Sequence, residues 1–92
     1  MQYMIIESYP GGPVPVYSRF RERGRLAPDD LHYVNSWITD DGARCFQVME
    51  CDDPALLQTW MDAWSDIVHF EVIPVISSPE AAARFVDTPD HT

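Results

Sequence analysis

The chain contains no lysine, so all six of its positive side chains are arginines, against 15 aspartates and glutamates. The formal charge at pH 7 is therefore 6 − 15 = −9. A field of this sign repels phosphate backbones, which argues against nucleic acid as a partner. Four arginines fall within the stretch RFRERGR at 19–25. This basic patch is a solvated helix face, a partner for acidic side chains or a site for an anionic ligand.

Cysteine is scarce, with Cys45 and Cys51 as the only two. On one extended strand they lie about 20 Å apart, whereas a disulfide needs Cα atoms within about 7 Å. The two thiols therefore cannot pair within the chain, which favours a reducing compartment. The metal-binding spacings HxH and CxxC are missing, and His32 and His69 fall on strands expected at opposite edges of a sheet. The sequence therefore predicts no metal site, and nothing in it indicates a cofactor.

Long apolar runs are missing as well. Nothing approaches the roughly 20 apolar residues of a transmembrane helix, and the first ten residues lack the basic start of a signal peptide. We therefore expect a cytoplasmic protein that does not contact membranes. With 92 residues and a hydrophobic fraction of 46%, the chain is expected to form one domain over 1–86, followed by a flexible tail at 87–92.

Strand-forming residues are concentrated in four segments, at 2–9, 31–38, 45–51 and 70–76. Between the second and third, the pair Asp41-Gly42 favours a two-residue hairpin turn, which sets the register of these two strands. The expected cross-strand pairs are Trp37 with Phe46, Ser36 with Gln47, and Tyr33 with Glu50. Pro74 cannot donate a ladder hydrogen bond, so the fourth strand is expected at a sheet edge.

Three helices are predicted from start and stop signals. The first begins near Pro15 and stops at Gly24, the second spans 52–67 with Asp53 as its N-cap, and a short third follows Ser78. The order β-α-β-β-α-β plus a short C-terminal helix is the ferredoxin-like α+β pattern. It implies an antiparallel sheet in the order 4-1-3-2 with helices on one face.

The third segment, CFQVMEC at 45–51, is mostly apolar on both faces. Helices cover one face of the expected sheet, and a large apolar patch on the other usually marks an interface. The simplest way to bury this face is to pack it against the same face of a second copy. We therefore expect a homodimer in the form of a dimeric α+β barrel.

Five stretches carry a resemblance to a known family. They are FRERGR (20–25), the pair Ser36-Trp37, CFQVME (45–50), WMDAWSD (60–66) and FEVIPV (70–75). To about residue 84, the chain resembles a family of short bacterial and archaeal proteins known only as a domain of unknown function. It is similar, more distantly, to the dimeric α+β barrel superfamily, which includes antibiotic-biosynthesis-type monooxygenases and stress-responsive barrel proteins.

This resemblance implies a ferredoxin-like fold and a dimeric barrel, but no activity. Some monooxygenases of the wider superfamily act through an Asn, a Trp and a His. The chain has Asn35, Trp37 and His32 or His69. No shared motif places these residues equivalently, so the roles are not transferred.

A pocket between helices and sheet is the main candidate binding site. Its expected apolar walls are Trp37, Trp60 and Trp64, and its expected polar contacts are Gln47, Glu50, Arg19 and Arg23. Trp60 and Trp64, one turn apart, are alternatively plain core residues. Gln47 is alternatively satisfied by a hydrogen bond to Ser36.

Glu50 has three possible roles on its strand. It pairs with Arg23, reaches water at the strand end, or acts as a general acid or base with a raised pKa. The same three roles are open for Glu7 and Glu71 on the neighbouring strands. The Cys45 thiol is expected to be buried and inert.

Two classes of function remain open from the sequence. The first is a small-molecule-binding barrel, which includes a cofactor-independent enzyme of monooxygenase-like type. The second is a non-catalytic interaction or scaffold homodimer, whose polar residues only satisfy one another. A cavity with convergent polar groups supports the first class. A fully packed core, with Glu50 paired and no cavity above about 300 Å³, supports the second.

Overall fold

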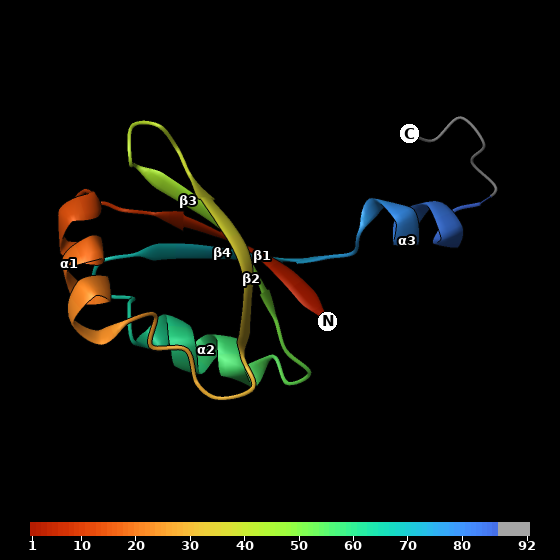
Figure 1. Ribbon diagram of the computed structural model, residues 1–92, viewed down its shortest axis with the longest axis horizontal. Coiled ribbons are helices and arrows are strands. Elements are labelled where there is room, and N and C mark those ends of the chain that lie inside the picture. Colours follow the sequence, from red (N-terminus) through yellow and green to blue (C-terminus); the bar gives the residue numbers. More distant parts are fainter. Residues whose placement is uncertain (87–92) are drawn as a thin grey trace.

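The computed structural model describes residues 1–86, which form one antiparallel sheet and three helices (Figure 1). The elements are β1 (Gln2–Ser8), α1 (Pro13–Arg23), β2 (His32–Ile38), β3 (Arg44–Glu50), α2 (Ala55–Asp62), β4 (His69–Val75) and α3 (Ser78–Arg84). The sheet order is β2-β3-β1-β4, which is 4-1-3-2 counted from the β4 edge. Pro74 lies on this edge strand, as the sequence predicts.

One face of the sheet packs against α1 and α2 and forms the core. Alternate residues of the two central strands point to it, from Tyr3 to Glu7 on β1 and from Cys45 to Met49 on β3. α1, α2 and the turns after α2 supply the other half of the core, and their buried side chains include Val16, Leu57, Trp60 and Trp64. The burial of these apolar side chains stabilises the fold.

The opposite face of the sheet carries no helix of the described residues. We call it the open face, and its apolar side chains are Met4, Ile6, Trp37, Phe46, Val48, Ile73 and Val75. Trp37 is 56% exposed there. An apolar surface of this kind is unusual on a protein that works as a monomer.

The β2–β3 hairpin has the predicted register near its turn but a longer loop. Trp37 lies opposite Phe46, as predicted. The connection runs from Thr39 to Ala43, because the Thr39 N–H donates to the Arg44 carbonyl at 2.9 Å. Gly42 has φ 73° and closes a turn onto the Thr39 carbonyl. The expected two-residue loop was wrong, because the Thr39 hydroxyl also bonds Asp41 and favours the wider turn.

A β-bulge further along β2 overturns the expected pairing of Tyr33 with Glu50. The register shifts between Tyr33 and Asn35, so that Tyr33 lies opposite Met49 and His32 opposite Glu50. An extra residue in one strand reverses the face of every residue beyond it. Tyr33 therefore lies on the helix-covered side of the sheet, opposite the buried Met49.

The helix ends differ from their predicted positions. α2 covers Ala55–Asp62 instead of 52–67, and the chain continues to residue 67 as turns. Asp53 still acts at its start, because Oδ1 accepts the Ala55 N–H at 3.0 Å. In α3 the N-cap is Ser77, not Ser78, because its hydroxyl accepts the Glu80 N–H at 3.2 Å.

α3 lies apart from the sheet and the other helices, at the end of an extended segment that follows β4 (Figure 1). The predicted tail at 87–92 lies outside the described residues. None of the helices in the described part of the chain has the length and apolar character needed to cross a membrane. Both cysteines are free thiols, as the sequence predicts, and both are buried.

Candidate functional site

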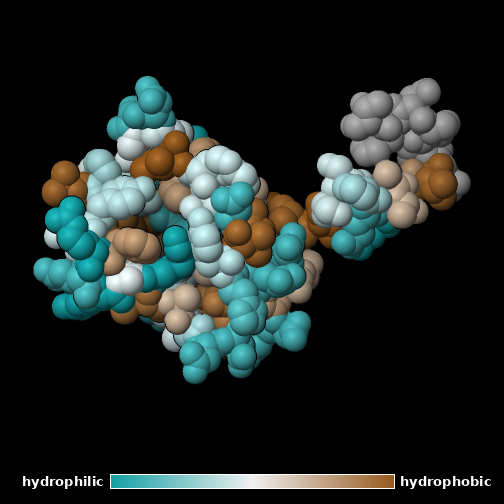
Figure 2. Space-filling view, in the orientation of Figure 1, coloured by the Kyte–Doolittle hydropathy of each residue, from teal (hydrophilic) through white to brown (hydrophobic). Residues whose placement is uncertain are grey.

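A cavity of about 150 Å³ lies between the helices and the covered face of the sheet. It opens to solvent, and the space-filling view shows a hollow between α1 and β2 (Figure 2). The residues that line it are Glu7, Tyr9, Val16, Tyr17, Phe20, Arg25, Ser36, Cys45, Gln47, Trp60, Trp64 and Phe70. Most are aromatic or apolar, with a few polar groups that converge from β1, β3 and the loop after α1.

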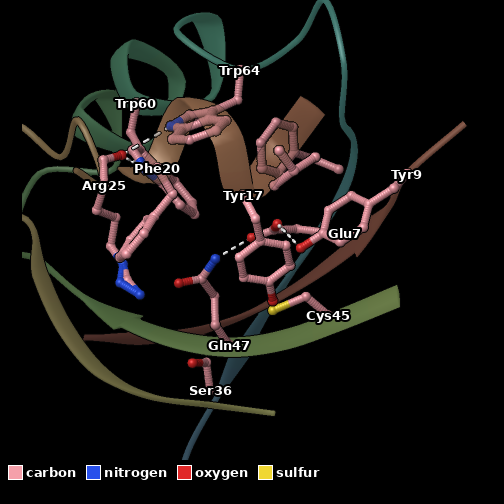
Figure 3. Close-up of a pocket in the computed structure, with 12 residues that line it drawn as sticks. Glu7, Tyr9, Tyr17, Phe20, Arg25, Ser36, Cys45, Gln47, Trp60 and Trp64 are labelled. Atoms are coloured by element: carbon pink, nitrogen blue, oxygen red, sulfur yellow. Dashed lines mark hydrogen bonds between the residues drawn. The ribbon is translucent and has the colours of Figure 1, made fainter. Parts of the chain in front are cut away.

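Glu7 is the acidic group of this cavity. Its residue is only 5% exposed. The Tyr9 hydroxyl donates to Glu7 Oε1 at 3.1 Å, and Gln47 Nε2 donates to Oε2 (Figure 3). Burial raises the pKa of Glu7 above its ordinary 4.5, although both hydrogen bonds and the nearby Arg25 charge oppose the rise. The carboxyl group is therefore poised to exchange a proton at higher pH than a surface glutamate.

Gln47 presents a buried acceptor that has no partner. Its side chain is 5% exposed, and its nitrogen is used by Glu7. Within residues 1–86 its Oε1 accepts no hydrogen bond. The expected bond to Ser36 was wrong, because the Ser36 hydroxyl lies 2.6 Å from the Tyr33 hydroxyl instead. The Gln47 oxygen is turned away from Glu7, on the side where Arg25 lies (Figure 3).

Trp60 and Trp64 are both core residues and walls of the cavity. Their indole N–H groups donate to the same acceptor, the carbonyl oxygen of Arg25, at 3.1 and 2.9 Å. The Trp60 ring also packs against Phe70, with centroids 5.5 Å apart. The rings are thus buried core residues that also face the cavity.

The Arg25 side chain lies at the cavity between two aromatic rings. Its guanidinium carbon is 3.8 Å from the centroid of Tyr33 and 5.2 Å from that of Phe20. Its backbone is held by the two indoles, and the next residue, Leu26, has φ 62°. Positive φ is rare for a residue of this size, and such backbone is often found at functional sites.

Cys45 lies beside Glu7 as a protonated thiol. Burial raises its pKa to about 11, and the neighbouring Glu7 adds to the rise. A thiol reacts as its thiolate, so this residue is a poor nucleophile at neutral pH. Burial likewise raises the pKa of Tyr9, which keeps its hydroxyl as a donor to Glu7. Neither group is suited to covalent chemistry.

The structure brings together only part of the predicted site. Gln47, Trp60 and Trp64 line the cavity. Trp37 and Glu50 do not, because they lie on the open face and its rim, where both are exposed. Of the three roles considered for Glu50, solvent exposure is the one observed.

The two predicted arginines also lie away from the cavity. Arg19 forms a two-pronged ion pair with Asp66, at 2.7 and 2.8 Å, and lies over the Trp64 ring. Arg23 is exposed. One arginine of the basic patch does line the cavity, and it is Arg25.

Glu7 and Arg25 are the site residues that sequence reasoning did not select. A signal for Glu7 was present, since it is the one charged residue of the central strand β1. For Arg25 the sequence indicated only the basic patch at 19–25, because which arginine reaches the cavity depends on the path of the loop after α1. No group of three or more His, Cys, Asp and Glu side chains in the described part of the chain is arranged to hold a metal ion.

Fold and site together define an α+β protein with an open antiparallel sheet and a small aromatic cavity with a buried acid. Residues 1–88 match the family described as the domain of unknown function DUF3303, and the chain belongs to this family. The predicted membership of a small uncharacterised family is thereby confirmed. No curated protein and no solved structure matches the chain. Its function must therefore be argued from the cavity.

Proposed function

We propose that the chain binds a small ring-shaped organic molecule in the cavity, and that Glu7 serves this molecule as a general acid or base. The observation that carries the proposal is the buried Glu7 carboxyl, held by Tyr9 and Gln47 at an aromatic cavity that opens to solvent. A carboxyl whose pKa is raised toward neutrality is the group that proton-transfer catalysis requires.

The size of the cavity limits the ligand. A volume of about 150 Å³ equals that of an engineered protein cavity that takes up benzene. One six-membered ring fits this space, and its substituents can extend through the mouth. The rings of Trp60, Trp64 and Phe70 offer apolar and stacking surface for such a molecule.

A cofactor-independent enzyme of monooxygenase-like type is one form of this proposal. The features that support it are the helix-and-sheet cavity and a base that can remove a proton from the bound molecule. The strand order and the placement of α1 and α2 on one face support a ferredoxin-like fold. The two free, buried thiols support a reducing, cytoplasmic setting.

The test uses the tryptophans of the cavity as reporters. In a Trp37→Phe background, the remaining tryptophans of the chain are Trp60 and Trp64, so fluorescence reports the cavity. A library of ring-sized molecules, both neutral and charged, is titrated against this protein. We expect saturable changes in emission with some of them. If no member changes the emission or protects the cavity in NMR spectra, the binding proposal is wrong.

Glu7→Gln separates catalysis from binding. The amide has nearly the same shape but cannot exchange a proton, so a molecule that is turned over should still bind within several-fold while its turnover is lost. Turnover that survives this substitution would exclude Glu7 as the acid or base, and the cavity would then be a binding site only.

A non-catalytic homodimer is the second candidate function. It is supported by the open face, whose apolar side chains have no helix over them in the described part of the chain. It is also supported by the cavity volume of about 150 Å³, which is below the roughly 300 Å³ typical of ligand pockets. Two such sheets packed face to face would form the dimeric α+β barrel. The two candidates are compatible, because the cavity lies on the other side of the sheet.

A further inference from the structure

Two polar groups at the cavity have no hydrogen-bond or ion-pair partner within residues 1–86. One is the amide oxygen of Gln47, which is buried and accepts no hydrogen bond. The other is the guanidinium of Arg25, whose side-chain contacts are the rings of Tyr33 and Phe20. Every other charged or amide group that lines the cavity is engaged, since Glu7 accepts from both Tyr9 and Gln47. The two unpaired groups therefore indicate which chemical groups a ligand needs in order to pair with them.

The Gln47 oxygen requires a donor. Buried polar atoms are nearly always hydrogen-bonded, because an unpaired acceptor has lost its water without compensation. The Gln47 nitrogen is committed to Glu7, which fixes the oxygen toward the rest of the cavity. A hydroxyl or N–H group of a bound molecule would satisfy it, and would lie close to the Glu7 carboxyl.

The Arg25 guanidinium requires an anion. Its planar group lies on the Tyr33 ring, and its N–H donors form neither an ion pair nor a hydrogen bond with any described residue. Arg19 shows the contrast, since its donors are consumed by Asp66 and the Ala63 carbonyl. An unpaired guanidinium held in a fixed plane at a cavity suits a carboxylate or another planar anion.

We propose that the ligand is a small ring-shaped acid with a hydroxyl or N–H substituent, whose anionic group binds Arg25 and whose donor binds Gln47 Oε1. This inference rests on the proposed function, because it names the ligand class for the same cavity. The two unpaired groups lie on the same side of the cavity, and one comes from the loop after α1 and the other from β3 (Figure 3). Such an acid satisfies both at once.

Matched probes test each requirement on the protein with the Trp37→Phe substitution. The three hydroxybenzoates carry an anion and a donor. The corresponding methylbenzoates keep the anion and the shape but lack the donor, and the hydroxybenzamides keep the donor but lack the charge. We expect the best hydroxybenzoate to bind at least about tenfold more tightly than either matched partner, as hydrogen bonds to charged groups and buried acceptors require.

Two arginine variants assign the anion site. Arg25→Gln should weaken the hydroxybenzoate at least about tenfold and leave the hydroxybenzamide unchanged. Arg23→Gln is the control, because it removes the same charge from an exposed position outside the cavity. Arg25→Met preserves the apolar stem between the two rings and replaces Arg25→Gln if that protein does not fold.

The outcomes separate this inference from the proposed function. Equal binding of hydroxybenzoate, methylbenzoate and hydroxybenzamide, unchanged by Arg25→Gln, would overturn the ligand class while the binding cavity stands. Stronger binding of the methylbenzoate than of the hydroxybenzoate would overturn the role of Gln47. If neither these probes nor the neutral ring library binds, the proposed function and the inference fail together.

Discussion

Glu7 and Gln47 meet because of the register between β1 and β3. Ile5 lies opposite Gln47 and Glu7 opposite Cys45, so Glu7 and Gln47 are diagonal neighbours on one face. Diagonal side chains lie about 7–8 Å apart at the backbone, a separation that two long polar side chains can bridge. A buried carboxyl is costly to ionise, and the two donors offset only part of that cost. The carboxyl therefore influences stability as well as any chemistry.

Glu7→Gln should change how stability depends on pH. A carboxyl whose pKa is raised in the folded protein binds more protons there than in the unfolded chain. Its stabilising contribution is complete below its ordinary pKa of 4.5 and is lost as the pH rises through the raised value. We therefore expect the unfolding free energy of the wild type to fall, relative to Glu7→Gln, as the pH rises above 4.5.

Urea unfolding of both proteins between acidic and mildly alkaline pH measures this difference. Taking the difference removes the titration of surface groups such as Asp66, whose pKa is lowered by Arg19 and whose effect has the opposite sign. A wild type that gains stability over the variant with rising pH would mean that the fold favours the Glu7 anion.

Cys45 should resist alkylation. With its pKa at about 11 instead of 9.0, the thiolate is roughly a hundredfold rarer at pH 8 than for an ordinary thiol. We expect iodoacetamide to modify Cys45 at least about a hundredfold more slowly in the folded protein than in urea. Peptide mass spectrometry of a Cys51→Ser variant gives the rate at Cys45 alone. Fast labelling in the folded state would show that the thiol is accessible or ionised.

At the scale of elements, the loop after α1 controls the site. Its Arg25 carbonyl receives the N–H groups of both Trp60 and Trp64, which ties the loop to α2 and the turns that follow. The apolar spacing of these tryptophans predicted a buried face but not the loop carbonyl that they share. Backbone acceptors are present at every residue, so a sequence cannot indicate which one a side chain will meet.

The β-bulge in β2 is a second feature that the sequence did not predict. The Asp41-Gly42 signal was enough to set Trp37 opposite Phe46, because register near a turn follows from local chemistry. Beyond the bulge the alternation no longer predicts the face, and Tyr33 moves to the helix-covered side, where it meets Arg25. The arginine that lines the cavity is therefore Arg25, two residues after the expected Arg23.

Gly42 links the hairpin turn to the start of α1. It has φ 73°, and a Cβ added there would lie 3.2 Å from Pro13 Cγ. Gly42→Ala should lower the unfolding free energy by about 1–2 kcal/mol, the cost of left-handed backbone for a residue with a side chain. Thermal and urea unfolding measure this loss.

Gly11→Ala is the control for this prediction. No atom lies within 4 Å of a Cβ added at Gly11, so the substitution should change stability by less than about 0.5 kcal/mol. Equal effects at both positions would mean that the turn geometry at Gly42 does not constrain the fold.

At the scale of the whole molecule, the two sheet faces have different roles. The segment CFQVMEC predicted that both faces of β3 need cover, and the structure divides it accordingly. Cys45, Gln47 and Met49 are buried under the helices, while Phe46 and Val48 lie on the open face. The residue pattern of this segment was enough to predict an apolar surface on the open face, because a strand without a polar face is visible in the sequence. The cavity was not visible, because its shape depends on how the helices sit over the sheet.

The open face gives the last prediction, which tests the proposed homodimer. Trp37→Glu places a charge on this face without entering the core, because the side chain is 56% exposed in the single chain. If a second copy covers the face, the wild type should sediment as a dimer at micromolar concentration, and the variant as a folded monomer. A buried, unpaired charge at an interface costs several kcal/mol, which is enough to shift association by orders of magnitude. Val14→Glu, on an exposed position of α1, is the matched control and should remain a dimer. A wild-type monomer, or a dimer that both variants preserve, would mean that no second copy packs on the open face. The homodimer proposal would then be wrong, and the cavity would remain the candidate functional site.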